Sequence, residues 1–196
     1  MDPGNPSPPV VSRAPRRTCV AALVLLALAL ASTPPRAAAG SPERANGRDV
    51  KAVFLVNFLS FSEWPAAKLG PVPARVVIAV LGDPEFAEVV EKAAAGHTAN
   101  GRPIVVQSAE SPEHAAGAHL VFIASSQAGR LPAVLRTLAA ASVLTVGDTD
   151  GFAQDGVAIN LYTFDNRVRI EVNSTAAARA GVHLSANLMR LARIVE

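Results

Sequence analysis

Residues 143–173 constrain the fold of this 196-residue chain most, because they read as three β-strands in succession. Short runs of apolar and β-branched residues are separated by Gly, Asp and Asn, a pattern typical of strands and hairpins. The last run, residues 167–172, alternates strictly between charged and apolar residues. This alternation predicts a hairpin with one face on a hydrophobic core and a charged face that includes Arg169 and Glu171.

The rest of the chain after residue 47 alternates between apolar strands and periodic helices. Further strands are predicted over residues 76–81, 104–106 and 119–124, and helices over residues 48–63, 84–95, 131–141, 174–180 and 186–194. This order predicts an α/β fold. We expect a single compact domain whose mixed sheet has about six strands, ends in a C-terminal β-hairpin and is flanked by helices in Rossmann-like layers.

The first predicted helix carries much of the aromatic content of the chain. Apolar residues at spacings of three and four predict the row that faces the core: Val50, Val53, Phe54, Phe58 and Phe61. Asn57 lies on the same predicted face, where a buried amide needs hydrogen-bond partners.

The N-terminus has the layout of a secretory signal peptide. Arg13, Arg16 and Arg17 precede an apolar run over residues 20–31, and an Ala-x-Ala cleavage site follows directly before Gly40. The apolar run is shorter than the roughly 20 residues that a spanning helix needs. We therefore expect export to the periplasm, with an uncleaved anchor as the alternative.

We accordingly expect three segments: a cleaved signal peptide over residues 1–39, a disordered linker over 40–47 and the α/β domain over 48–196. Cys19 is the only cysteine, and it lies within the predicted signal peptide. The mature domain would therefore contain neither a disulfide nor a thiolate that could act as nucleophile or metal ligand.

No group of residues in the sequence has the spacing of a catalytic or metal-binding motif. The four histidines form no HxxxH or HxH pair, and nucleophile-elbow and phosphate-loop patterns are missing. We expect no catalytic residues, no metal and no cofactor. Acidic and basic residues nearly balance after Gly40, which gives no electrostatic basis for nucleic-acid binding.

A small-ligand site is the alternative function that the residues leave open. Ser125, Ser126 and Gln127 directly follow the predicted strand over residues 119–124, and Gly82-Asp83 follows another strand. Open α/β sheets bind ligands at such strand ends. Ordinary capping of the next helix explains the same residues, since every α/β domain has several such loops.

Six segments taken together resemble the YfiR family of small exported proteins. They are residues 51–65, 81–86, 101–104, 143–161, 167–173 and 180–195. The resemblance implies a periplasmic α/β domain that forms a homodimer and represses the periplasmic sensor domain of a membrane-bound diguanylate cyclase or another sensor protein. It also implies release by a redox change or by an outer-membrane lipoprotein.

The same resemblance suggests where a partner would bind. If the chain works similarly, Arg169, Glu171 and Asn173 should lie near the partner surface. One departure matters, because the well-known regulatory member depends on paired cysteines and this chain has none after Cys19. Disulfide-based control is therefore not expected here.

Overall fold

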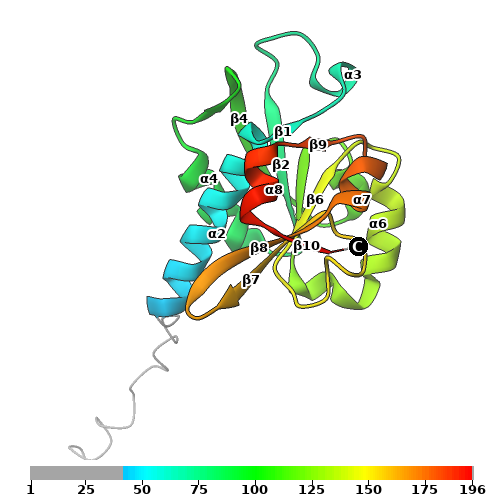
Figure 1. Ribbon diagram of the computed structural model, residues 1–196. Coiled ribbons are helices and arrows are strands. Elements are labelled where there is room, and N and C mark those ends of the chain that lie inside the picture. Colours follow the sequence, from blue (N-terminus) through cyan, green and yellow to red (C-terminus); the bar gives the residue numbers. More distant parts are fainter. Residues whose placement is uncertain (1–41, 196) are drawn as a thin grey trace, which may run out of the picture. The chain divides into compact units, whose positions relative to one another are not determined.

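An eight-stranded mixed β-sheet organises residues 42–195, the part of the chain that the computed structural model describes (Figure 1). Its strands are β2 (Val76–Leu81), β3 (Thr98–Ala99), β4 (Arg102–Ala109), β5 (Leu120–Ile123), β6 (Leu144–Gly147), β7 (Ile159–Phe164), β8 (Arg167–Asn173) and β10 (Arg193–Val195). They lie in the order β10-β8-β7-β6-β5-β2-β4-β3. Strand β1 (Ser62–Glu63) pairs separately with β9 (His183–Leu184). The predicted signal peptide lies outside the described residues.

Helices cover both faces of this sheet. They are α2 (Pro42–Ser60), α3 (Ala66–Leu69), α4 (Pro84–Ala94), α5 (Pro112–Ala115), α6 (Leu131–Leu138), α7 (Ser174–Arg179) and α8 (Ala186–Leu191), with a 3-10 helix, η1, over Ser125–Arg130. The α/β fold class and the flanking helices are as predicted.

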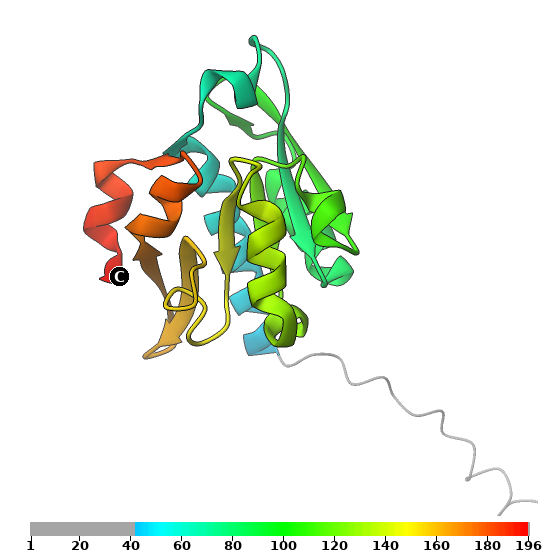
Figure 2. The same cartoon turned by 90° about the vertical axis from the view of Figure 1, so that its right-hand side faces the viewer.

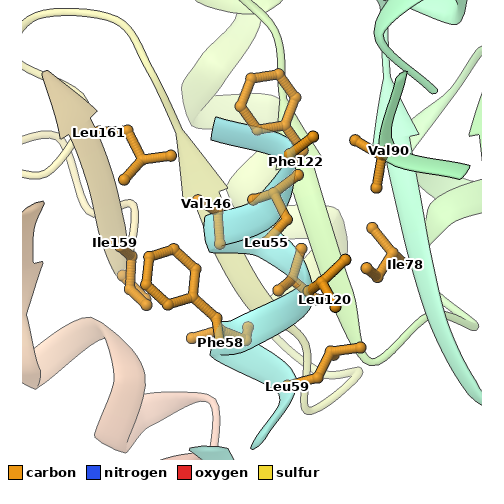
Figure 3. Close-up of a cluster of buried hydrophobic side chains, with 14 of the residues drawn as sticks. Leu55, Phe58, Leu59, Ile78, Val90, Leu120, Phe122, Val146, Ile159 and Leu161 are labelled. Carbon is orange, nitrogen blue, oxygen red and sulfur yellow. The ribbon is translucent and has the colours of Figure 1, made fainter. Parts of the chain in front are cut away.

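Two hydrophobic clusters lie on opposite faces of the sheet. Alternate residues of β2 explain the division: Ile78 packs into the cluster that contains α2 and α4, and Ala79 into the cluster that contains α5 and α6. Figure 3 shows the larger cluster, in which the ring of Phe58 from α2 lies beside Ile159 of β7, with Leu161 further along the same strand. Because β2 and β5 are buried on both faces, their sequences are apolar throughout.

The predicted hairpin is confirmed as β7 and β8. These strands pair antiparallel, with Leu161 opposite Ile170. Asp165 and Asn166 join them with φ values of 48° and 57°, the left-handed conformations that a two-residue type I′ turn requires. The predicted core-facing row of β8 is confirmed, because Ile170 and Val172 are buried and Val168 is half-buried.

The predicted buried face of the first helix is only partly right. Phe58 is buried and Phe54 packs half-buried against the core, as predicted. Val50, Val53 and Phe61 are 39%, 51% and 39% exposed, and the rest of the core-facing side is formed by Ala52, Leu55, Val56 and Leu59. Asn57 is also exposed. The helix is apolar on nearly every side, so two faces satisfy the helical spacing, and packing against the sheet decides between them.

Both ends of the described chain also differ from prediction. Helix α2 begins at Pro42, inside the predicted linker, where proline suits a first helical turn. The last helix ends at Leu191, and residues predicted to continue it form β10 beside β8. The short strands β3 and β10 raise the number of strands in the sheet from about six to eight.

Candidate functional site

The outer row of the β7–β8 hairpin contains the residues that the sequence suggested for a partner. Its cross-strand pairs are Asn160 with Glu171, Tyr162 with Arg169, and Phe164 with Arg167. Exposure rises toward the turn: the first pair is buried, Tyr162 is half-buried, and Phe164 is 58% exposed. Arg167 and Arg169 are also exposed. The free part of this row therefore combines two arginines with Phe164, and Tyr162 beside them is half-buried under the guanidinium of Arg193.

Glu171 does not lie on this free surface, contrary to the prediction. It is 4% exposed. One carboxylate oxygen accepts a hydrogen bond from Asn160 Nδ2 at 3.3 Å, and the other pairs with the guanidinium of Arg193. Arg193 lies opposite Glu171 because β10 covers the edge of β8. The prediction failed since the sequence pattern gave no sign that a strand would cover this edge.

Asn173 is a structural residue as well, 6% exposed. Its Oδ1 accepts from the backbone N–H of Ala176 at 2.8 Å and so caps α7, while Nδ2 donates to the carbonyl of Ala153 at 2.8 Å. The cap itself agrees with the sequence, since asparagine is a preferred N-cap residue. Of the three residues predicted at the partner surface, only Arg169 is therefore exposed.

The loop suggested for a ligand lies where β5 ends, beside the end of β2. Ser126 Oγ donates to the carbonyl of Gly82 at 2.9 Å, and Gln127 Nε2 donates to Ser126 Oγ at 3.1 Å. Arg130 Nε donates to Gln127 Oε1 at 2.7 Å. Gly82 has a φ of 84°, a left-handed conformation that favours glycine, and a Cβ there would also press on the Gln127 and Ser126 side chains. These side chains hold the two loops together, while Ser125 lines a cavity.

That cavity lies at the carboxyl ends of the parallel strands and is rich in charge. Both terminal guanidinium nitrogens of Arg48, Nη1 and Nη2, donate to the Asp83 carboxylate at 3.0 Å, and Lys51 pairs with Asp148 at 2.8 Å. The volume is about 110 Å³, and Ser125 is part of the lining. The two ion pairs fasten α2 to the loops after β2 and β6.

Sequence reasoning missed these two ion pairs. The sequence did contain a signal for them. Arg48 and Lys51 are three residues apart at the start of the predicted apolar helix, and Asp83 and Asp148 closely follow two predicted strands. The sequence does not show which aspartate each cation meets, because the partners lie 35 and 97 residues apart.

His119 is the one buried histidine among the described residues. Its Nδ1 accepts from the backbone N–H of Val77 at 3.1 Å, and its Nε2 lies 3.3 Å from the carbonyl of Lys68. This pattern requires the neutral ring, since a protonated Nδ1 is no acceptor. Burial lowers the pKa of His119 below its ordinary value, and the nearby charge of Lys68 lowers it further.

Metal ligands are not grouped anywhere in residues 42–195. We find no set of three His, Cys, Asp or Glu side chains there that could hold an ion. His97, His114 and His183 are exposed and separate. The same residues contain no helix with the length and hydrophobicity that a membrane span requires.

Comparison with known proteins gives one family match. A family model described as YfiR/HmsC-like matches residues 48–193. No curated protein matches the chain. A conserved domain protein from Vibrio cholerae O1 biovar El Tor is similar in structure, with a TM-score of 0.51 and 14% identity over 80% of this chain and 60% of that chain.

A second solved structure resembles the chain less closely. It is an ABC domain from Streptococcus pneumoniae in complex with L-Trp, with a TM-score of 0.49 and 11% identity over 74% of this chain and 60% of that chain. The chain thus spans about 60% of the length of the solved proteins it matches. At such low identity, the likeness to the Vibrio protein shows a common fold and nothing more.

Proposed function

The chain belongs to the YfiR/HmsC-like family, and we propose that it is a periplasmic regulator that binds and represses the sensor domain of an inner-membrane diguanylate cyclase. The family match carries this proposal, since it extends over residues 48–193, nearly all of the described domain. Loss of the protein would then raise cyclic-di-GMP. We propose no catalytic role, because the family is regulatory.

We place the partner contact on the free part of the hairpin row, around Arg169. Phe164, Arg167 and Tyr162 surround it with aromatic and guanidinium groups. Such residues carry much of the binding energy in protein interfaces. Glu171 and Asn173 support this surface from inside rather than contacting the partner, and an acidic partner surface would complement the two arginines.

Release of the partner does not involve a disulfide in this proposal, because residues 42–195 contain no cysteine. A second protein would then have to compete for the regulator, and the family resemblance suggests an outer-membrane lipoprotein. The resemblance also suggests a homodimer. The exposed apolar residues Val50 and Val53 of α2, together with Phe61 directly after the helix, offer surface for such a contact.

Small-ligand binding near Ser125 is the second candidate. The charged cavity beside it measures about 110 Å³, well below the roughly 300 Å³ of an ordinary ligand pocket. Its cations are already paired with Asp83 and Asp148. Only a small ion would fit, so we place protein binding first. A thermal-shift screen with inorganic anions tests this candidate, since a bound ion raises the melting temperature.

The regulatory proposal is tested by measuring cyclic-di-GMP in the host. Deletion of the gene should raise the level, and the wild-type gene should restore it. Arg169→Glu should fail to restore it, whereas Arg136→Glu, which changes another exposed arginine on α6, should restore it fully. Immunoblots establish equal amounts of each protein. An unchanged cyclic-di-GMP level after deletion would refute the proposal.

A further inference from the structure

Strand β4 has an uncovered edge. On one side, residues 104–109 pair with β2 along their whole length. On the other side, β3 pairs only with Arg102 and Pro103. Figure 1 shows β4 at the margin of the sheet beside α4. Among residues 42–195, no strand continues the sheet past residues 104–108.

Hydrogen bonds to neighbouring strands show which backbone N–H and C=O groups of β4 lie on this edge. Ala109 turns its carbonyl toward β2, because it accepts from the N–H of Gly82 at 3.2 Å. The backbone N–H and C=O groups of successive residues in a strand point to opposite edges. Those of Ile104, Val106 and Ser108 therefore point away from β2. The turn at the start of β4 agrees: Asn100 and Gly101 have φ values of 51° and 75°, a type I′ turn that pairs Ala99 with Arg102.

Apolar grooves flank this edge on both faces of the sheet. On the α4 side, Ile104 and Val106 line a groove of about 510 Å³ together with Glu91. On the opposite side, Val105 lines a groove of about 630 Å³ with Arg75 and the proline-rich loop over residues 71–74. Two rows of side chains from an added strand would enter these two grooves.

The edge also lacks the usual protection against strand pairing. Natural sheets place lysines, prolines or bulges on exposed edges. Here Pro103 lies at the start, and the free part consists of Ile104, Val105, Val106, Gln107 and Ser108. We propose that this edge binds an extended segment of a partner protein by strand addition, with backbone hydrogen bonds for affinity and the two grooves for selection.

Charge indicates that the occupant is another protein rather than a second copy of the chain. A symmetric pair of β4 strands would continue the sheet and bring the two α4 helices together on one face. The exposed charges of α4 are Glu85, Glu88, Glu91 and Lys92, a net negative surface that would repel itself. The partner segment should instead carry β-branched residues, a basic residue facing Glu91 and an acidic residue facing Arg75.

This site is independent of the proposed cyclase contact. The β7–β8 hairpin and β4 lie toward opposite edges of the same sheet (Figure 2). The regulator would therefore be able to hold two proteins at once. Failure of one contact leaves the other untouched, so the two proposals are tested separately.

The test uses a synthetic peptide, Thr-Val-Lys-Val-Val-Glu-Val-Thr, which places lysine in one row and glutamate in the other. Binding to the protein purified from its host is measured by fluorescence anisotropy, and hydrogen exchange by NMR. We expect the amides of Ile104, Val106 and Ser108 to exchange freely without the peptide and to become protected with it. The amides of Val105 and Gln107, which face β2, should be protected in both states.

Matched variants distinguish the loss of a hydrogen bond on the β4 edge from a general loss of folding. Val106→Pro removes an outward N–H and should weaken peptide binding at least tenfold, whereas Val106→Thr keeps the N–H and the shape and should bind normally. Should Val106→Pro unfold, Ser108→Pro with Ser108→Ala as its control replaces it, because Ser108 is exposed. Wild-type protein that does not bind the peptide, proline variants that bind equally well, or outward amides already protected without the peptide would each overturn the proposal.

Discussion

Reversing the charge of Glu171 tests how the hairpin is held in place. The Glu171 side chain is 5% exposed, and its carboxylate pairs with Arg193 and accepts from Asn160. Glu171→Lys would bury a cation beside Arg193 and leave Asn160 without its acceptor. Breaking a buried ion pair costs about 3–5 kcal/mol. Because the Arg193 side chain is 61% exposed and can turn to water, we expect a loss near the lower end, about 3 kcal/mol.

The loss is measured as the free energy of unfolding in urea, followed by circular dichroism. It corresponds to a fall in Tm of roughly 6–12 °C for a domain of this size. Glu171→Gln keeps the shape and an acceptor, so it should cost only about 1–2 kcal/mol. Arg169→Glu, two residues away and exposed, should stay within about 0.5 kcal/mol of wild type.

A loss of less than about 1 kcal/mol in the free energy of unfolding of Glu171→Lys, the range of a surface substitution, would contradict the burial of this carboxylate. Glu171 would then lie at the surface, as the alternation of the sequence predicts, and β10 would not cover the hairpin edge. Equal losses from Glu171→Lys and Arg169→Glu would contradict the difference in burial on which the placement of the partner surface depends.

Three further predictions concern the core and the loops. Phe58→Ala should lower the free energy of unfolding by about 3–5 kcal/mol in urea, because Phe58 is 1% exposed; a loss below about 1 kcal/mol would contradict its packing. The pKa of His119 is lowered by burial, so the unfolded chain binds the proton more readily. Unfolding by urea should therefore become easier as pH falls below about 6.5, and less so in His119→Gln; equal pH profiles would be evidence against this. Arg102→Met removes donors to the carbonyls of residues 69, 70, 71 and 74, and should cost about 2–3 kcal/mol and speed proteolysis near residue 70; unchanged cleavage would count against this role.

The sequence predicted the elements whose pattern is local. The six predicted strands and the β7–β8 hairpin are all present, although β4 extends over Arg102–Ala109 and not only over residues 104–106. The caps at Asn173 and Ser185 also follow from residue type, and both accept the expected backbone hydrogen bond. These features depend on residues within a few positions of one another, so a single sequence contains the information.

The sequence could not predict features that depend on distant partners. Arg193 lies 22 residues from Glu171, and only the pairing of β10 with β8 explains why Glu171 is buried. The face of α2 was ambiguous because Val53 and Leu55 lie on different sides of an apolar helix. The GRPI segment, residues 101–104, shows the same limit. Arg102 is buried and bonds to four backbone carbonyls, a role that its charge does not suggest.

Photocrosslinking from position 169 tests the central claim most directly. A photoreactive residue replaces Arg169 in the host, cells are irradiated, and crosslinked proteins are purified through a tag and identified by mass spectrometry. We expect an adduct with a membrane-bound diguanylate cyclase from position 169, and none when the same photoreactive residue replaces Arg136. If position 169 gives no adduct, or if both positions give the same adducts, the hairpin surface is not the site at which this protein holds its partner.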